Sequence, residues 1–139
     1  MIGKGSGPAE GTPPYVHRPG RHLRVGRRGE EAAGRHLASL GYRILERSYR
    51  TRAGEIDLIA EDGATLVFVE VKTRSSLAFG RPAEAVGPGK RARIAASASL
   101  YLAIRGGPER PCRFDVVEVL EDPGGAVRIR HIHDAFEAG

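Results

Sequence analysis

Residues 54–74 of the chain read GEIDLIAEDGATLVFVEVKTR. Apolar residues fill two runs on either side of the turn sequence 61–64, which predicts two antiparallel strands at 55–60 and 65–73. Each strand carries what a buried strand ordinarily avoids, since Asp57 lies in the first and Glu70 and Lys72 lie in the second. Buried unpaired carboxylates cost several kcal/mol, so this hairpin predicts a compensating partner.

The two carboxylates can reach each other only in a suitable register. Side chains alternate across a strand, so Glu55 and Asp57 share one face, as do Glu70 and Lys72. If the turn 61–64 closes the hairpin, paired residue numbers sum to 125, and Glu55 lies opposite Glu70. Asp57 is then a diagonal neighbour of Glu70, within roughly 7–8 Å at Cα, close enough for the two to share one cation.

A divalent cation suits this pair of acids. Asp57, Glu70 and a backbone carbonyl such as that of Val71 offer the oxygen ligands that Mg²⁺ or Mn²⁺ takes, and Mg²⁺ keeps several waters in such a site. A metal-bound water could attack a phosphodiester while the metal neutralises the developing charge. Lys72 would lie over the same site, where it would hold that water and stabilise the transition state. The alternative is a structural role, either as a solvated Glu-x-Lys ion pair or as a buried salt-bridge network.

The flanking segments predict where this hairpin sits. A helix is expected at 25–40, ended by Gly41, with Glu30 on its inward stripe as a further ligand or water anchor. Strands are expected at 42–49, 113–120 and 127–132, a second helix at 90–105, and a long loop at 75–89. A helical crossover returns the next strand parallel to a central one. The sequence therefore predicts an α/β fold of order αβββαββ, a mixed five-stranded sheet flanked by helices.

Charge and composition limit the class of protein. The length of 139 residues predicts a single domain at 25–139, preceded by a flexible Gly- and Pro-rich arm at 1–24. The first 28 residues carry the whole net charge of +5, which fits a nucleic acid, an anionic protein partner or a solubility role. No apolar run resembles a membrane span or a signal peptide, and the single cysteine, Cys112, excludes an internal disulfide. A cytoplasmic location without a membrane partner is expected.

Other polar residues are candidates for phosphate contacts. Three cations open the second predicted helix, where they oppose the helix dipole unless an anion lies nearby, and two arginines flank the long loop. For all of them a solvated surface role is the alternative. Arg113 with Asp115 is expected to form a structural ion pair, and His131 and His133 to be structural or exposed rather than metal ligands. The predicted nucleic-acid contacts are Arg74, Arg81, Lys90, Arg91 and Arg93.

These motifs together resemble a known family. The order of elements resembles the restriction-endonuclease-like core of the PD-(D/E)xK superfamily. Within it, the segments 29–33, 54–59 and 68–74 look like the uncharacterised YraN-like family, as do Lys90 with Arg93-Ile94, the segment 113–117 and Ala135-Phe136. The resemblance covers about residues 25–136. It departs from the superfamily pattern where Ile56, instead of proline, precedes Asp57.

The acidic pattern is similar to that of archaeal Holliday junction resolvases. This likeness implies a Mg²⁺- or Mn²⁺-dependent endonuclease that cuts branched or structured DNA, and it implies a homodimer, because two sites address two strands. Glu30, Asp57 and Glu70 would be the catalytic, metal-binding carboxylates, and Lys72 the catalytic lysine. The alternative function is a non-catalytic accessory protein that binds nucleic acid with the same fold.

Overall fold

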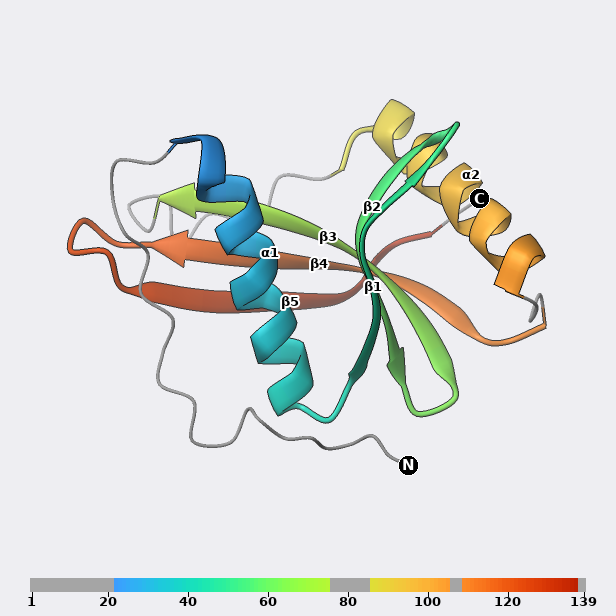
Figure 1. Ribbon diagram of the computed structural model, residues 1–139, viewed down its shortest axis with the longest axis horizontal. Coiled ribbons are helices and arrows are strands. Elements are labelled where there is room, and N and C mark those ends of the chain that lie inside the picture. Colours follow the sequence, from blue (N-terminus) through green and yellow to red (C-terminus); the bar gives the residue numbers. More distant parts are fainter. Residues whose placement is uncertain (1–21, 76–85, 106–108, 138–139) are drawn as a thin grey trace.

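The order of helices and strands is the one that the sequence predicts. A computed structural model describes residues 22–75, 86–105 and 109–137 (Figure 1). Its element order confirms the α/β class, and α1 begins three residues ahead of the expected boundary at 25, while residues 1–21 of the predicted arm lie outside the described residues. The elements are α1 (His22–Ser39), β1 (Arg43–Thr51), β2 (Gly54–Asp62), β3 (Thr65–Ser75), α2 (Pro88–Arg105), β4 (Cys112–Glu121) and β5 (Val127–Phe136).

The five strands form one mixed sheet in the order β1-β2-β3-β4-β5. Neighbouring strands are antiparallel except β3 and β4, which are parallel because the chain returns through α2 between them. Figure 1 shows α1 lying across the sheet and α2 lying beside the β1–β2 hairpin. Neither described helix is long and apolar enough to cross a membrane.

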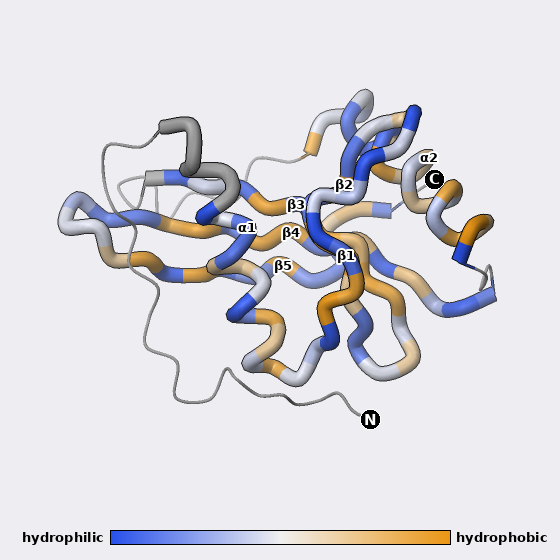
Figure 2. The backbone as a smooth tube through the Cα atoms, viewed as in Figure 1, coloured by the Kyte–Doolittle hydropathy of each residue, from blue (hydrophilic) through white to orange (hydrophobic). Residues whose placement is uncertain are grey.

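Alternating side chains divide the core between the two faces of the sheet. Leu58, Val67 and Val117 pack with Ala33 and Leu37 of α1. On the other face, Ile59, Phe68 and Val116 pack with Ile94 and Tyr101 of α2. Figure 2 shows the apolar residues concentrated along the central strands. Each helix therefore covers one face, and the sheet lies between the two.

The β2–β3 register differs from the expected one by two residues. The paired numbers sum to 127 instead of 125, from Asp62↔Thr65 to Leu58↔Val69. The hairpin loop is shorter than predicted because only residues 63 and 64 lie between the strands, and Gly63 takes the positive φ of 62° that a two-residue loop favours at its first position. Since the shift is even, each side chain stays on its predicted face.

A close approach of α1 to β3 sets the position of the helix. Gly29 is buried, and a Cβ atom built on it would collide with Thr73 Oγ1, while Thr73 Cβ would lie at an ordinary 3.7 Å. Glycine is required at this point because only its backbone allows α1 to lie this close to β3. The next residue of the helix, Glu30, is thereby brought to the sheet.

We expect Gly29→Ala to lower the free energy of unfolding by about 1 kcal/mol or more, because the clash outweighs the helix propensity gained. In a Thr73→Ala background the same substitution should be neutral or stabilising, since the colliding oxygen is gone. Urea unfolding of the four proteins of this double-mutant cycle measures the coupling. A coupling energy near zero would contradict the close approach.

Candidate metal centre

Asp57 lies where the sheet divides. The β2–β3 ladder ends at Leu58↔Val69, while β2 continues its pairing with β1 to the hairpin tip at Thr51↔Gly54. Beyond this pair a side-chain hydrogen bond replaces the backbone ladder, because Asp57 Oδ2 accepts a hydrogen bond from the backbone N–H of Val71 at 2.8 Å. The carboxylate is thus held by main chain at a fork between two strands.

The surroundings of Asp57 disfavour its charged form. Burial is the largest cause, followed by the negative charge of Glu70, and together with a smaller effect of Glu30 they raise the pKa of Asp57 to about 7. The Val71 N–H and the Lys90 ammonium act in the opposite direction. Near neutral pH this site therefore needs more positive charge than the described residues supply.

Glu70 is joined to the start of α2. Its side chain is 7% exposed, and its Oε2 lies 2.6 Å from the Lys90 Nζ. Lys90 is one of the predicted nucleic-acid contacts, and in the structure its ammonium also neutralises a buried carboxylate beside Asp57. Glu70 is buried and Lys90 is half-exposed, so their ion pair offsets part of the cost of burying the Glu70 charge.

Glu30 reaches the site from α1 and is oriented by β1. Ser48 Oγ donates a hydrogen bond to Glu30 Oε1 at 2.8 Å, and Ser48 has a positive φ of 49°, which is unusual for a residue other than glycine. β1 therefore kinks beside the fork in β2, and this kink lets its serine hold the helix carboxylate. Nothing in the local sequence marks Ser48 for this role.

One carboxylate oxygen from each of Glu30, Glu55 and Asp57 lies within 4.8 Å of the other two. Strand alternation predicts Glu55 on the face of Asp57, but Glu55 is not among the predicted ligands. The i, i+2 spacing on a strand was the signal that could have found it. These three carboxylates offer the oxygen ligands that hard cations such as Mg²⁺ prefer. Glu70, predicted as a ligand, is not in this group; it pairs with Lys90, and its charge acts on Asp57.

Lys72 is half-buried on β3 and follows Glu70 by two positions, so both side chains leave the same face of the strand. Within the described residues its Nζ has no hydrogen-bond or ion-pair partner. That Lys72 lies over the same site as Asp57 stays a prediction. Its ammonium is uncommitted within the described part of the chain.

The predicted phosphate contacts separate into different groups. Arg74 Nη1 pairs with Glu118 Oε2 at 2.5 Å, and only 18% of the Arg74 side chain is exposed. Glu118 is fully buried, and Arg130 Nε pairs with its other oxygen. Arg74 therefore belongs to an ion-pair network, and its contact with nucleic acid stays a prediction. Arg81 lies outside the described residues. Arg91 and Arg93 lie on the first turns of α2, where Arg93 is exposed.

A second cluster of potential ligands has a structural explanation. Oxygen or nitrogen atoms of Asp115, His131 and His133 lie within 4.8 Å of one another. Asp115 is fully buried, however, and its oxygens already accept hydrogen bonds from the Arg113 Nε, the His131 Nε2 and the Asp134 backbone N–H. The predicted Arg113–Asp115 ion pair is confirmed, and its guanidinium supplies the positive charge that a metal would bring.

Comparison with known proteins places the chain among sequences without an assigned activity. The sequence profile of the uncharacterised protein family UPF0102 matches residues 29–119. A UPF0102 protein of Symbiobacterium thermophilum is 56% identical over 115 residues, covering 83% of this chain and 98% of the relative. A UPF0102 protein of Syntrophus aciditrophicus is 49% identical over 122 residues, covering 88% and 95%. These matches confirm the resemblance to the YraN-like family.

The raised pKa of Asp57 predicts how stability depends on pH. Folding raises this pKa from 3.8 to about 7, so the folded protein holds a proton that the unfolded chain releases between these values. The contribution of Asp57 to the free energy of unfolding therefore falls as pH rises from about 4 to 7. Asp57→Asn keeps an acceptor for the Val71 N–H, and we expect it to be more stable than the wild type by about 2 kcal/mol at pH 8.

Urea unfolding in EDTA at pH 4 and pH 8 measures this difference. At pH 4 the two proteins should differ little, because Asp57 is then protonated in the folded state. Asp62→Asn, at the exposed end of the same strand, controls for the loss of one negative charge. Destabilisation by Asp57→Asn at both pH values would show that Asp57 does not carry the electrostatic cost.

Proposed function

The chain belongs to the uncharacterised protein family UPF0102, and we propose that it is a metal-dependent nuclease that hydrolyses phosphodiester bonds in branched or otherwise structured DNA. The family name states no activity, so the proposal is argued from the site. The observation that carries it is the half-buried Asp57, which has carboxylate oxygens of Glu30 and Glu55 within 4.8 Å and whose pKa is raised by burial and then by the charge of Glu70. A divalent cation bound by oxygen relieves that imbalance.

The donor set fits Mg²⁺ or Mn²⁺. Asp57 would hold the ion together with Glu30 and Glu55, whose carboxylate oxygens gather with its own, and Glu70 is the further ligand that the sequence predicts. The ion would lower the pKa of a bound water and neutralise charge on the phosphorus oxygens. The Val71 N–H keeps Asp57 at the fork, and Ser48 orients Glu30, so both acids are positioned before a substrate arrives.

Lys72 completes the proposed site. Its strand neighbour Glu70 already has a cationic partner in Lys90, and the Lys72 ammonium has no partner of its own within the described residues. An ammonium group so placed can hold the attacking water and stabilise negative charge in the transition state. The resemblance to resolvases supports branched DNA as the substrate, and the homodimer that it implies remains a prediction.

We expect purified protein to cut DNA only when Mg²⁺ or Mn²⁺ is present, and to cut four-way junctions or flaps faster than linear duplex. Asp57→Asn and Lys72→Ala should each lower the rate by about 100-fold or more while the fold persists. Gel assays of linear duplex, single strand, flap and junction, with metal or with EDTA, measure this.

A matched pair of variants controls this experiment. Glu30 faces the site and the adjacent Glu31 is exposed, so Glu30→Gln should slow cleavage and Glu31→Gln should not. Cleavage that persists in EDTA or in Asp57→Asn would refute the proposal. DNA binding without cleavage of any substrate would instead favour the accessory function, in which the same fold binds nucleic acid without cutting it.

The Lys90–Glu70 ion pair makes a separate prediction about metal affinity. The Lys90 ammonium competes with a divalent ion for Glu70, so Lys90→Met should bind Mn²⁺ about threefold more tightly, or better, at pH 8. Electron paramagnetic resonance of free Mn²⁺ measures the affinity without any substrate. Arg93→Met removes a positive charge from the same helix without touching Glu70. Equal affinities in these two variants would contradict the competition.

A further inference from the structure

The tip of the β1–β2 hairpin is anchored on α2. Thr51 Oγ1 and Ser97 Oγ are hydrogen-bonded at 2.9 Å, and Ser97 is fully buried. A Cβ atom built on Gly54 would lie 3.4 Å from Arg93 Cβ, so the hairpin backbone passes close against the helix. Segments some 40 residues apart in sequence therefore form one surface.

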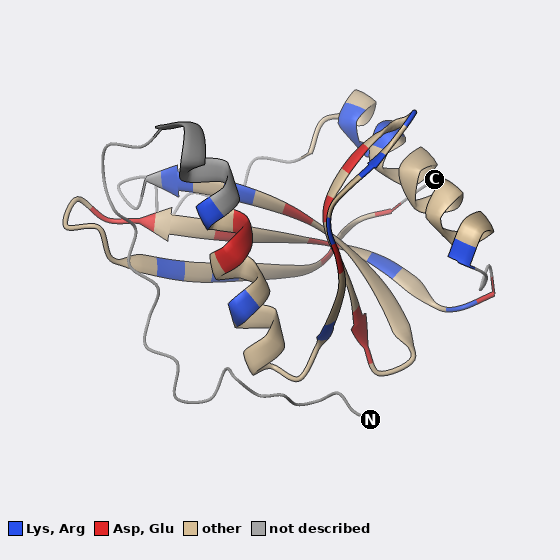
Figure 3. Ribbon diagram, viewed as in Figure 1, with Lys and Arg blue, Asp and Glu red and all other residues tan. Residues whose placement is uncertain are grey.

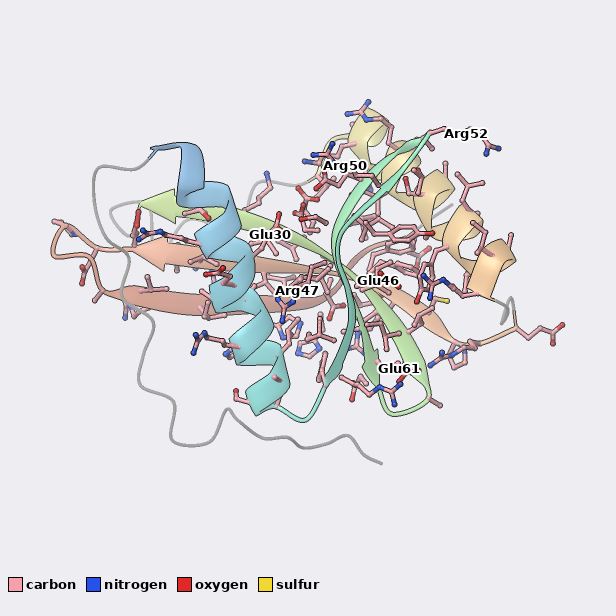
Figure 4. The ribbon with its side chains drawn as sticks, in the orientation of Figure 1. Glu30, Glu46, Arg47, Arg50, Arg52 and Glu61 are labelled. Carbon is pink, nitrogen blue, oxygen red and sulfur yellow. The ribbon has the colours of Figure 1, made fainter. Side chains whose placement is uncertain are left out.

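This surface is strongly basic. Arg50 and Arg52 lie at the hairpin tip, with Arg52 exposed and the Arg50 side chain 82% exposed (Figure 4). The exposed Arg93 lies next to them on α2, and Figure 3 shows Lys and Arg on both the hairpin tip and the first turns of that helix. No acidic residue lies in the first turn of α2 to offset these charges. We call the side chains of Arg50, Arg52, Lys90, Arg91 and Arg93 the hairpin–helix basic patch.

Two ion pairs join the patch to the proposed metal centre. Arg50 Nε lies 3.6 Å from Glu55 Oε1, and Lys90 Nζ lies 2.6 Å from Glu70 Oε2. Both carboxylates belong to the acidic site, so its rim is also the edge of the patch. A polyanion bound to the patch would therefore run directly past Asp57.

The chemistry of the patch selects phosphates rather than bases. Guanidinium groups bind phosphate oxygens through paired N–H donors, and helix dipoles at N-termini add positive potential. Base stacking needs exposed aromatic rings, but every described Tyr and Phe is buried or half-buried in the core, and Tyr49 packs edge-on against Tyr101. Contacts to the backbone alone carry no sequence information.

We propose that the hairpin–helix basic patch binds the phosphodiester backbone of nucleic acid independently of base sequence and presents it to the metal centre. Only the presentation of the backbone to the metal centre rests on the proposed function; the binding itself does not. No sequence motif or predicted helix terminus indicates that Arg50 and Arg52 bind an anion. Their role follows from the packing of the hairpin tip on α2.

Binding in EDTA tests the patch without cleavage. Two fluorescent 20-bp duplexes of unrelated sequence are titrated with the full chain between 50 and 200 mM salt, and anisotropy is recorded. Arg52→Gln and Arg93→Gln should each reduce the slope of log K against log salt by about 0.9 and weaken binding roughly 3- to 10-fold. The wild type should bind the two duplexes with nearly equal affinity.

Arg43→Gln is the matched control. It removes the same charge from the opposite end of β1, and its partner Glu61 keeps Arg110. A loss of affinity in Arg43→Gln as large as in Arg52→Gln would overturn the patch, because net charge alone would then explain binding. Unchanged slopes in the patch variants, a tenfold preference for one duplex, or no binding by the wild type would overturn it as well.

The failure of either proposal can be recognised separately. If the patch variants lose affinity but the wild type never cuts DNA with Mg²⁺ or Mn²⁺, the patch stands and the nuclease proposal fails. If the wild type cuts DNA while the patch variants bind and cut as it does, the nuclease proposal stands and the patch fails. Circular dichroism of each variant tests whether its substitution leaves the fold intact.

Discussion

The arrangement of the site depends on one hydrogen bond, which the Val71 N–H donates to the Asp57 carboxylate. Had the β2–β3 ladder continued in register, Asp57 would stand directly opposite Glu70, and like charges in that position destabilise a sheet. The strands separate instead, and one carboxylate bonds to main chain. The fork lets acids from both faces meet, and it sends the β1–β2 hairpin toward α2, where its arginines join those of the helix.

Two buried acids and the half-buried Asp57 show how surroundings separate structural from functional carboxylates. Glu118 is neutralised by Arg74 and Arg130, and Asp115 accepts hydrogen bonds from an arginine, a histidine and a backbone N–H, which lower the pKa of Asp115 against the effect of its burial. Asp57 has one backbone donor, and its burial, together with the charges of Glu70 and Glu30, raises its pKa to about 7. Fully compensated acids hold the sheet together. The charge of Asp57 is only partly compensated, so an added cation would stabilise the protein most at this residue. The proposed metal centre is placed there for this reason.

Much of the fold could be predicted from local patterns, whereas individual contacts could not. Periodicity and turn residues identified the seven elements of the described residues. Even the wrong β2–β3 register kept Asp57 and Glu70 near each other, because an error of two residues preserves the strand face. Arg74 and Lys90, two of the predicted phosphate contacts, pair with carboxylates in the structure. These ion pairs could not be predicted, because a basic side chain near a site looks the same in sequence whether its partner is a ligand or a buried acid.

The amino-acid sequence alone identifies the ionisable residues, the elements that carry them and the faces from which they project, since these follow from backbone periods of 2 and 3.6 residues. Tertiary structure decides which charges meet. Ser48 reaches Glu30 only because β1 kinks, and the hairpin arginines join α2 only because Thr51 and Gly54 pack on Ser97 and Arg93. Electrostatic energies and pKa values depend on distances between elements, and these distances are set when the helices pack on the sheet.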